Sequence, residues 1–142
     1  MAEHSTFEEE LNRKGHIVYT NHGVSMLPLL RQGRDVMIIE KKGPNRCGKY
    51  DVVLFKRPNG QYILHRILKV REQDYYIVGD NCRKGEYVRE EQILGILTGI
   101  VRKQKRINVT DRTYRLYVHL WCDLFPIRSL LILLRELLQG FC

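Results

Sequence analysis

Residues 51–67 read DVVLFKRPNGQYILHRI and contain two apolar runs with a turn signal between them. Asn59-Gly60 is a dipeptide that tight β-hairpin turns favour, because both residues accept a positive φ. The surrounding residues are rich in valine, isoleucine and aromatic side chains, which suit strands. We therefore expect a β-hairpin whose strands cover 51–55 and 61–70.

Short apolar runs on either side of this hairpin predict further strands, separated by glycine, proline and asparagine turns. We expect these strands at 16–19, 35–40, 74–78 and 93–101. No long amphipathic helix separates them, so a βαβ arrangement is excluded and the fold class is mainly β within the α+β class.

The chain begins with a segment typical of a short helix, over 1–15. Ser5 or Thr6 can cap it, and Glu8 or Glu9 can complete a capping box. Gly15 then ends it. We accordingly divide the chain into this helix, a β domain over 16–109 and a tail over 110–142.

The tail is rich in leucine and aromatic residues, but charged residues interrupt every apolar run of about 18 residues, so a membrane span is not expected. Pro126 divides the tail, which predicts two amphipathic helices hinged at this proline. They could lie in a bilayer interface, or they could pack on the β domain or on another subunit.

The chain of 142 residues carries 24 basic and 16 acidic side chains, a formal net charge of +8. Residues 102–142 alone hold 8 basic and 3 acidic side chains. The basic cluster 102–106 leads into the apolar tail rather than alternating with stacking aromatics. This order favours an anionic membrane surface over nucleic acid as the partner. We expect a peripheral membrane association, on the cytoplasmic face rather than the opposite one.

The four cysteines form no CxxC pair and no zinc-type spacing, so we expect reduced thiols, no metal and no cofactor. Cys47, Cys82 and His65 are the one set that could bind a metal, but they are scattered along the sequence.

Three short segments hold the residues that could carry chemistry. They are GVSMLPLL at 23–30, YILHRI at 62–67 and VGDN at 78–81. Each alone has an ordinary structural explanation, since serine often caps a helix and an aspartate often holds a turn.

In this order, the three segments resemble the boxes of the type I signal peptidase family, and more broadly the signal peptidase and LexA-like clan of serine peptidases. The resemblance covers residues 20–101. It implies a signal peptidase-like β domain over most of 16–109. In most bacterial members a lysine precedes the arginine of the second box. Here that position is His65, so the resemblance is to the histidine-type members.

The resemblance implies that Ser25 is the nucleophile and His65 the general base. A serine hydroxyl needs such a base, and a histidine has an unperturbed pKa of ~6.5. Glu86 or Asp80 would orient His65, with Glu86 favoured and Asp80 more suited to holding its loop.

The oxyanion and substrate site would consist of Ser25, through its backbone N–H, with Met26 and Gly23. Gly23 stands where many bacterial members carry an assisting serine. His22 is a minor rival for the role of base. A lysine base, Lys56 or Lys69, is the further alternative.

The expected function is a serine endopeptidase that cleaves signal or leader peptides near a membrane. The chain shows no N-terminal anchor or signal peptide, which narrows the expected substrate toward a small peptide made in the cytosol. The alternative is a catalytically inactive membrane-surface or peptide-binding module of the same fold. An autoproteolytic regulator is least expected, because no DNA-binding segment is evident. The sequence leaves the oligomeric state open.

Overall fold

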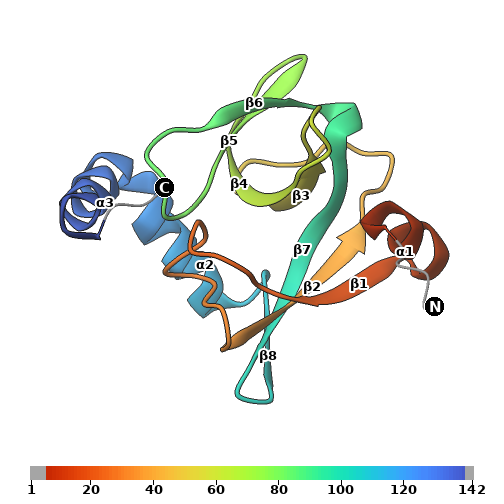
Figure 1. Ribbon diagram of the computed structural model, residues 1–142, viewed down its shortest axis with the longest axis horizontal. Helices are drawn as coiled ribbons and strands as arrows, with labels where there is room; N and C mark the ends of the chain where they lie inside the picture. The colour runs from red at the N-terminus through yellow and green to blue at the C-terminus, as the bar shows by residue number, and fades with distance from the viewer. Residues whose placement is uncertain (1–5, 140–142) are drawn as a thin grey trace.

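The computed structural model describes residues 6–139, and within them the chain is an α+β protein built on an antiparallel sheet of eight strands (Figure 1). The strands are β1 (His16–Thr20), β2 (Asp35–Lys41), β3 (Val52–Lys56), β4 (Tyr62–Val70), β5 (Asp74–Val78), β6 (Glu86–Arg89), β7 (Ile93–Arg102) and β8 (Lys105–Asn108). The helices are α1 (Phe7–Lys14), α2 (Arg112–Val118) and α3 (Phe125–Gln139), with short turns η1 (Glu90–Gln92) and η2 (His119–Asp123). The mainly β expectation agrees with this architecture at the level of class.

The hairpin predicted around Asn59-Gly60 is present as β3 and β4. Their antiparallel register places Val53 opposite His65, and Gly60 takes the positive φ of 90° that the turn requires. This register places His65 within a paired strand, opposite Val53 of β3, and the pairing of β4 with β5 begins at the next residue, Arg66.

Strand β7 organises the sheet, whose order is β1-β2-β7-β3-β4-β5-β6. One edge of β7 pairs with β2, and the other pairs with β3 and then with β8. A Cβ added at Gly95 would lie 2.7 Å from the Ile39 side chain, so this glycine lets two strands pack closely. The expected strands are all present. The sequence did not predict β6 or β8, which are short and largely polar.

Two apolar clusters form the core. One contains Leu11, Met26, Ile39 and Leu97 with their neighbours, and the other contains Phe55, Ile67 and Ile77 with theirs. Met26, next to the predicted nucleophile, is 1% exposed. The first cluster therefore anchors the loop that carries Ser25.

Helix α1 begins as predicted. Thr6 is its N-cap and forms a capping box with Glu9, while Gly15 ends the helix in the left-handed conformation. Ser5, the other predicted cap, lies outside the described residues. The helix reaches the sheet through Leu11, which is 2% exposed.

The tail forms two helical segments, but their break falls at Leu124 instead of Pro126. Pro126 is the second residue of α3, a place where proline costs a helix no hydrogen bond. The segments Arg112–Asp123 and Phe125–Leu138 meet at a bend of 79°. Within the described residues, no single helix has the length and apolarity of a membrane span. Among those residues, only this bent pair, taken together, has enough length and apolar composition.

Candidate active site

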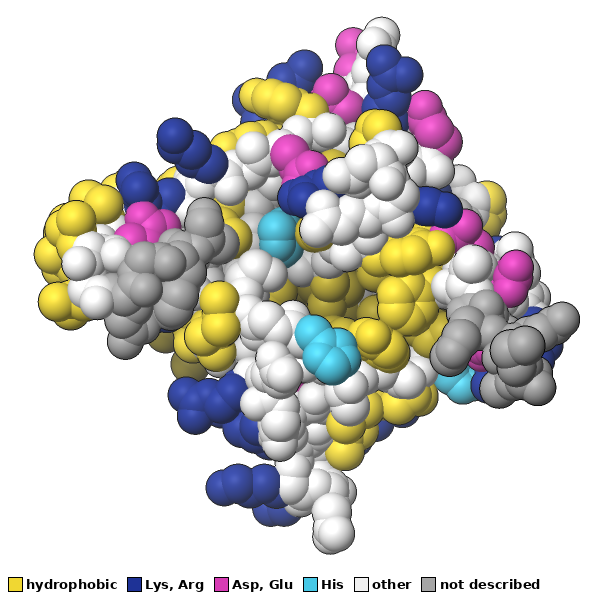
Figure 2. Space-filling view, viewed as in Figure 1, with side chains coloured by type: hydrophobic (Ala, Val, Ile, Leu, Met, Phe, Trp, Pro, Cys, Tyr) yellow, Lys and Arg dark blue, Asp and Glu magenta, His cyan; other side chains and the backbone are white. Residues whose placement is uncertain are grey.

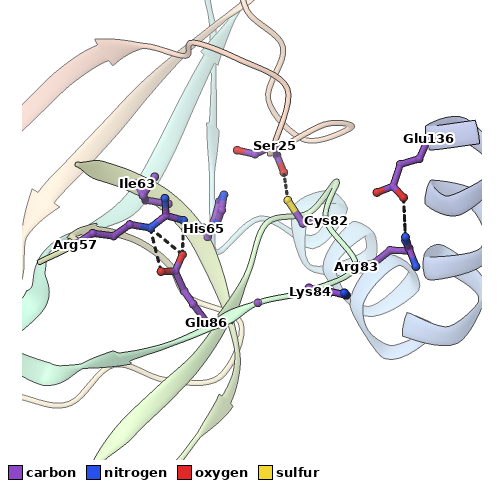
Figure 3. A pocket seen from close by; sticks show the side chains of 10 residues that line it. Ser25, Arg57, Ile63, His65, Cys82, Arg83, Lys84, Glu86 and Glu136 are labelled. Carbon is purple, nitrogen blue, oxygen red and sulfur yellow. Dashed lines mark hydrogen bonds and ion pairs between the residues drawn. The ribbon is translucent and has the colours of Figure 1, made fainter. Parts of the chain in front are cut away.

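A pocket of about 820 Å³ opens between the β4–β6 side of the sheet and α3 (Figure 3). Three of the predicted site residues contribute to it, one from each of three different elements. It is lined by Ser25, Arg57, Ile63, His65, Cys82, Arg83, Lys84, Gly85, Glu86 and Glu136. The fold therefore brings Ser25, His65 and Glu86 to one cavity, and it places Asp80 behind the cavity wall.

Ser25 lies in an irregular turn before β2, with its side chain half-buried. The loop after β5 holds this turn: the Asn81 N–H donates to the Ser25 carbonyl at 2.8 Å, and the Asn81 side-chain amide donates to the Val24 carbonyl at 3.0 Å. The Asp80 N–H is 3.4 Å from the Met26 sulfur. The first and third sequence boxes are thus bonded to one another through their backbones.

Gly79 shows how tightly the three boxes converge. A Cβ added to this residue would lie 2.7 Å from the Ser25 carbonyl oxygen, 2.8 Å from the Cys82 sulfur and 3.0 Å from Cδ2 of His65. Atoms of Ser25, Cys82 and His65 therefore crowd one position that only glycine leaves open. Gly79 belongs to the third sequence segment, and the fold shows why a residue with a side chain could not replace it.

His65 projects from β4 into the pocket, and its side chain is half-buried. Burial lowers the pKa of His65 to about 4, opposed by the nearby charge of Glu86 and reinforced by Arg57. This value differs from the unshifted histidine pKa that the sequence predicts. In the folded protein, the imidazole is instead neutral throughout the physiological range, which is the protonation state that a general base requires.

Both candidate orienting carboxylates bind arginines. Glu86 forms a bidentate pair with Arg57, whose Nη2 is 2.6 Å from Oε1 and whose Nε is 3.0 Å from Oε2. Asp80 forms a bidentate pair with Arg66. Among the described residues, no hydrogen bond joins His65 to either carboxylate. The expected carboxylate–histidine hydrogen bond is therefore not formed, because arginines occupy both acceptors.

The Asp80 carboxylate sits in a network that the sequence did not predict. Tyr117 donates to its Oδ2 at 2.7 Å, and the Trp121 indole N–H donates to its backbone carbonyl at 2.7 Å. Burial, and then the charge of Asp80, raises the pKa of Tyr117, so its hydroxyl remains a donor. The expectation that Asp80 holds its loop agrees with this geometry, although the partners come from Arg66 and the tail.

Helix α3 forms hydrogen bonds with the loop of residues 79–82. Arg128 is 1% exposed and its Nη2 donates to the carbonyls of Gly79 at 3.0 Å and Cys82 at 3.3 Å. Arg135 donates to the Asn81 side chain at 2.8 Å. The only sequence signal was an arginine interrupting an apolar helix. The tail is thus part of the structure that holds the site.

The oxyanion candidates are placed unequally. Within residues 6–139, the Ser25 N–H donates no hydrogen bond to another group of the protein. The Met26 side chain is committed to the core, and Gly23 is exposed with a φ of 84° outside the pocket lining. His22 stacks edge-on against Tyr19 and does not line this pocket.

The expected reduced thiols need one correction. Cys47 and Cys122 are free and buried, but Cys82 is disulfide-bonded. Within the part of the chain that the structure describes, no three His, Cys, Asp or Glu side chains are placed to hold a metal ion. The chemistry available at the pocket is therefore that of a hydroxyl, a neutral imidazole and two arginine–carboxylate pairs.

Comparison of the chain with protein-family models, curated proteins and solved structures found no match. The functional argument therefore depends on the geometry of the pocket.

Proposed function

We propose that this protein is a serine endopeptidase of the signal peptidase and LexA-like clan, with Ser25 as nucleophile and His65 as general base. One observation carries the proposal: three segments far apart in sequence meet around Gly79, where the Ser25 carbonyl oxygen and Cδ2 of His65 lie 2.7 and 3.0 Å from the position of an added Cβ. The pocket beside them is large enough for a peptide segment.

In the proposed reaction, the Ser25 hydroxyl attacks the scissile carbonyl carbon while His65 takes its proton. The Ser25 N–H stabilises the oxyanion that develops. His65 then returns the proton to the leaving amine, and water hydrolyses the acyl-enzyme by the same route in reverse. Burial keeps His65 unprotonated but also lowers its proton affinity, and the nearby charge of Glu86 opposes that loss.

The substrate would be an extended peptide or preprotein segment. The resemblance implies small residues next to the cleaved bond. The pocket adds two fixed ion pairs, Arg57–Glu86 on the sheet side and Arg83–Glu136 on the α3 side. The backbone N–H and C=O groups of a bound peptide can form hydrogen bonds with the charged side chains of these pairs.

The alternative is an inactive peptide-binding module of the same fold. The observation that favours it is the commitment of both carboxylates to arginines, which leaves His65 without an orienting acid. Such a module would bind the peptides that the enzyme is expected to cleave, and it would release them intact.

The test is cleavage of a peptide library, read by mass spectrometry. Wild-type protein should cut a defined subset, and Ser25→Ala should cut none of it while keeping its fold. Ser129→Ala is the matched control, because the Ser129 hydroxyl lies outside the pocket and has no hydrogen-bond partner among the described residues. Cleavage retained by Ser25→Ala overturns the proposal. Binding without cleavage by the wild type selects the alternative.

A further inference from the structure

Helix α3 divides its side chains unusually. All three charged residues between Phe125 and Gln139 contact the loop beneath the helix: Arg128 and Arg135 bond the loop, and Glu136 pairs with Arg83 at 2.8 Å. The opposite side of the helix is left to leucine and isoleucine. A helix at the surface of a soluble domain normally places its charges on that side.

The outward apolar side chains continue along both tail helices. Within each of the two segments, most of them recur three or four residues apart, which places them on one face of that segment. Their exposed fractions run from 46% to 85% in this set, which we call the apolar stripe: Leu116, Leu120, Leu124, Ile127, Leu130, Leu131, Leu134, Leu137 and Leu138. Exposed apolar side chains in such number along two neighbouring segments indicate an interaction surface.

Exposed positive charge lies on α2 and in the hairpin that precedes it. Arg112 and Arg115 are exposed on α2, and Lys103, Lys105 and Arg106 are exposed in the β7–β8 hairpin. Figure 2 shows hydrophobic side chains gathered over α3 and dark blue side chains near α2 and β8 on the same face. An apolar surface bordered by cations matches an anionic bilayer, whose acyl chains lie beneath negative headgroups.

We propose that the apolar stripe is a docking surface for an anionic lipid bilayer. The helices lie along the boundary between headgroups and acyl chains, with the stripe inserted and the β7–β8 hairpin on the headgroups. The 79° bend supports a surface position, since neither helix alone has the make-up of a span.

Docking also fixes where the pocket lies, because Glu136 of α3 lines it. Its opening is then held beside the bilayer, next to peptides anchored in the membrane. This extension to substrate delivery rests on the proposed peptidase function, whereas lipid docking does not.

The test is co-sedimentation of the full chain with phosphatidylcholine vesicles, with and without phosphatidylglycerol. The wild type should sediment with the anionic vesicles. The variant Ile127→Gln, Leu131→Gln, Leu134→Gln should lose at least about tenfold in partitioning. The matched control replaces exposed apolar residues elsewhere, as Val18→Gln, Val70→Gln, Tyr87→Gln, and should bind as the wild type does.

A second variant tests the charge. Lys103→Gln, Lys105→Gln, Arg106→Gln should lower binding to anionic vesicles about tenfold or more and leave binding to neutral vesicles unchanged. Ser25→Ala should sediment like the wild type, which separates this proposal from peptidase activity. Failure of the wild type to bind anionic vesicles overturns the proposal. A dimer in solution that the stripe variant dissociates also overturns it, since a second copy then covers the stripe.

Discussion

Arg66 and Asp80 form an ion pair in which both side chains are fully buried and two hydrogen bonds, of 2.8 and 2.9 Å, join them. Arg66 follows the proposed base in β4, and Asp80 belongs to the loop that binds the Ser25 turn. The pair therefore connects the strand of His65 to the loop that holds the Ser25 turn. Its role is to hold the site together, and the Asp80 carboxylate is filled by Arg66 and Tyr117.

Removing the carboxylate of this pair should lower the free energy of unfolding. Asp80→Asn leaves the Arg66 charge buried without its counter-ion, which costs about 3–5 kcal/mol of unfolding free energy. Urea denaturation measures the loss. The control is Glu86→Gln, whose pair with Arg57 is about one-third exposed and should cost only about 0–1 kcal/mol. Equal losses in the two variants would contradict the structural role of Asp80.

The Arg57–Glu86 pair should tune the base. Arg57 lowers and Glu86 raises the pKa of His65, within a shift that burial dominates. Arg57→Gln should therefore raise the pKa of His65, and Glu86→Gln should lower it. Titration of the His65 ring protons by NMR measures both changes. A pKa that stays the same in both variants would show that neither charge reaches the imidazole.

Acid should destabilise the protein through His65. Above about pH 6.5, the histidine is neutral in both the folded and unfolded states, so it has no effect on stability. Between about 6.5 and the folded pKa of about 4, only the unfolded chain takes up the proton, so stability falls with pH.

The full loss from this group is of the order of 3 kcal/mol and is reached below pH 4. The wild type should thus lose more stability than His65→Gln between pH 7 and pH 4.5, as measured by chemical denaturation. Parallel pH dependences would contradict the lowered pKa. Activity should remain level down to about pH 5, whereas a rise confined to the region near pH 9 would indicate Lys56 or Lys69 as the base.

Arg128 should position the loop beside Ser25. Arg128→Met keeps the length of the side chain but removes the donors to Gly79 and Cys82, so hydrogen exchange in residues 79–82 should accelerate. The kcat of the proposed peptidase should fall, because the loop that holds the Ser25 turn is less well ordered. Arg112→Met, on the exposed side of α2, is the matched control and should leave the exchange rates unchanged. If exchange is as slow in Arg128→Met as in the wild type, Arg128 does not hold the loop of residues 79–82.

Local signals in the sequence predicted the elements that such signals control. Asn59-Gly60 predicts its hairpin because turn geometry depends on two residues, and Thr6 with Glu9 predicts a helix start for the same reason. Strand β6 escaped prediction because its pairing with β5 comes from the sheet, and its sequence is too short to show a pattern.

Three of the residues that the sequence singled out, Ser25, His65 and Glu86, line one pocket. The sequence did not predict the contacts that hold this pocket together. The role of Arg128 could not be predicted, because its acceptors are backbone carbonyls 46 and 49 residues away. Every residue has such a carbonyl, so the sequence does not mark these two. The hinge at Leu124 was missed because Pro126 fits inside the first turn of a helix.

Ser25 and His65 are proposed to act as one catalytic unit, and a double-mutant cycle of the two residues measures this coupling. On the best library peptide, kcat/KM should fall at least about 10³-fold in Ser25→Ala and in His65→Gln. The double variant should be no slower than the single ones, because residues that act together lose their effect together. Losses that multiply in the double variant, or activity that survives in Ser25→Ala, would contradict the account.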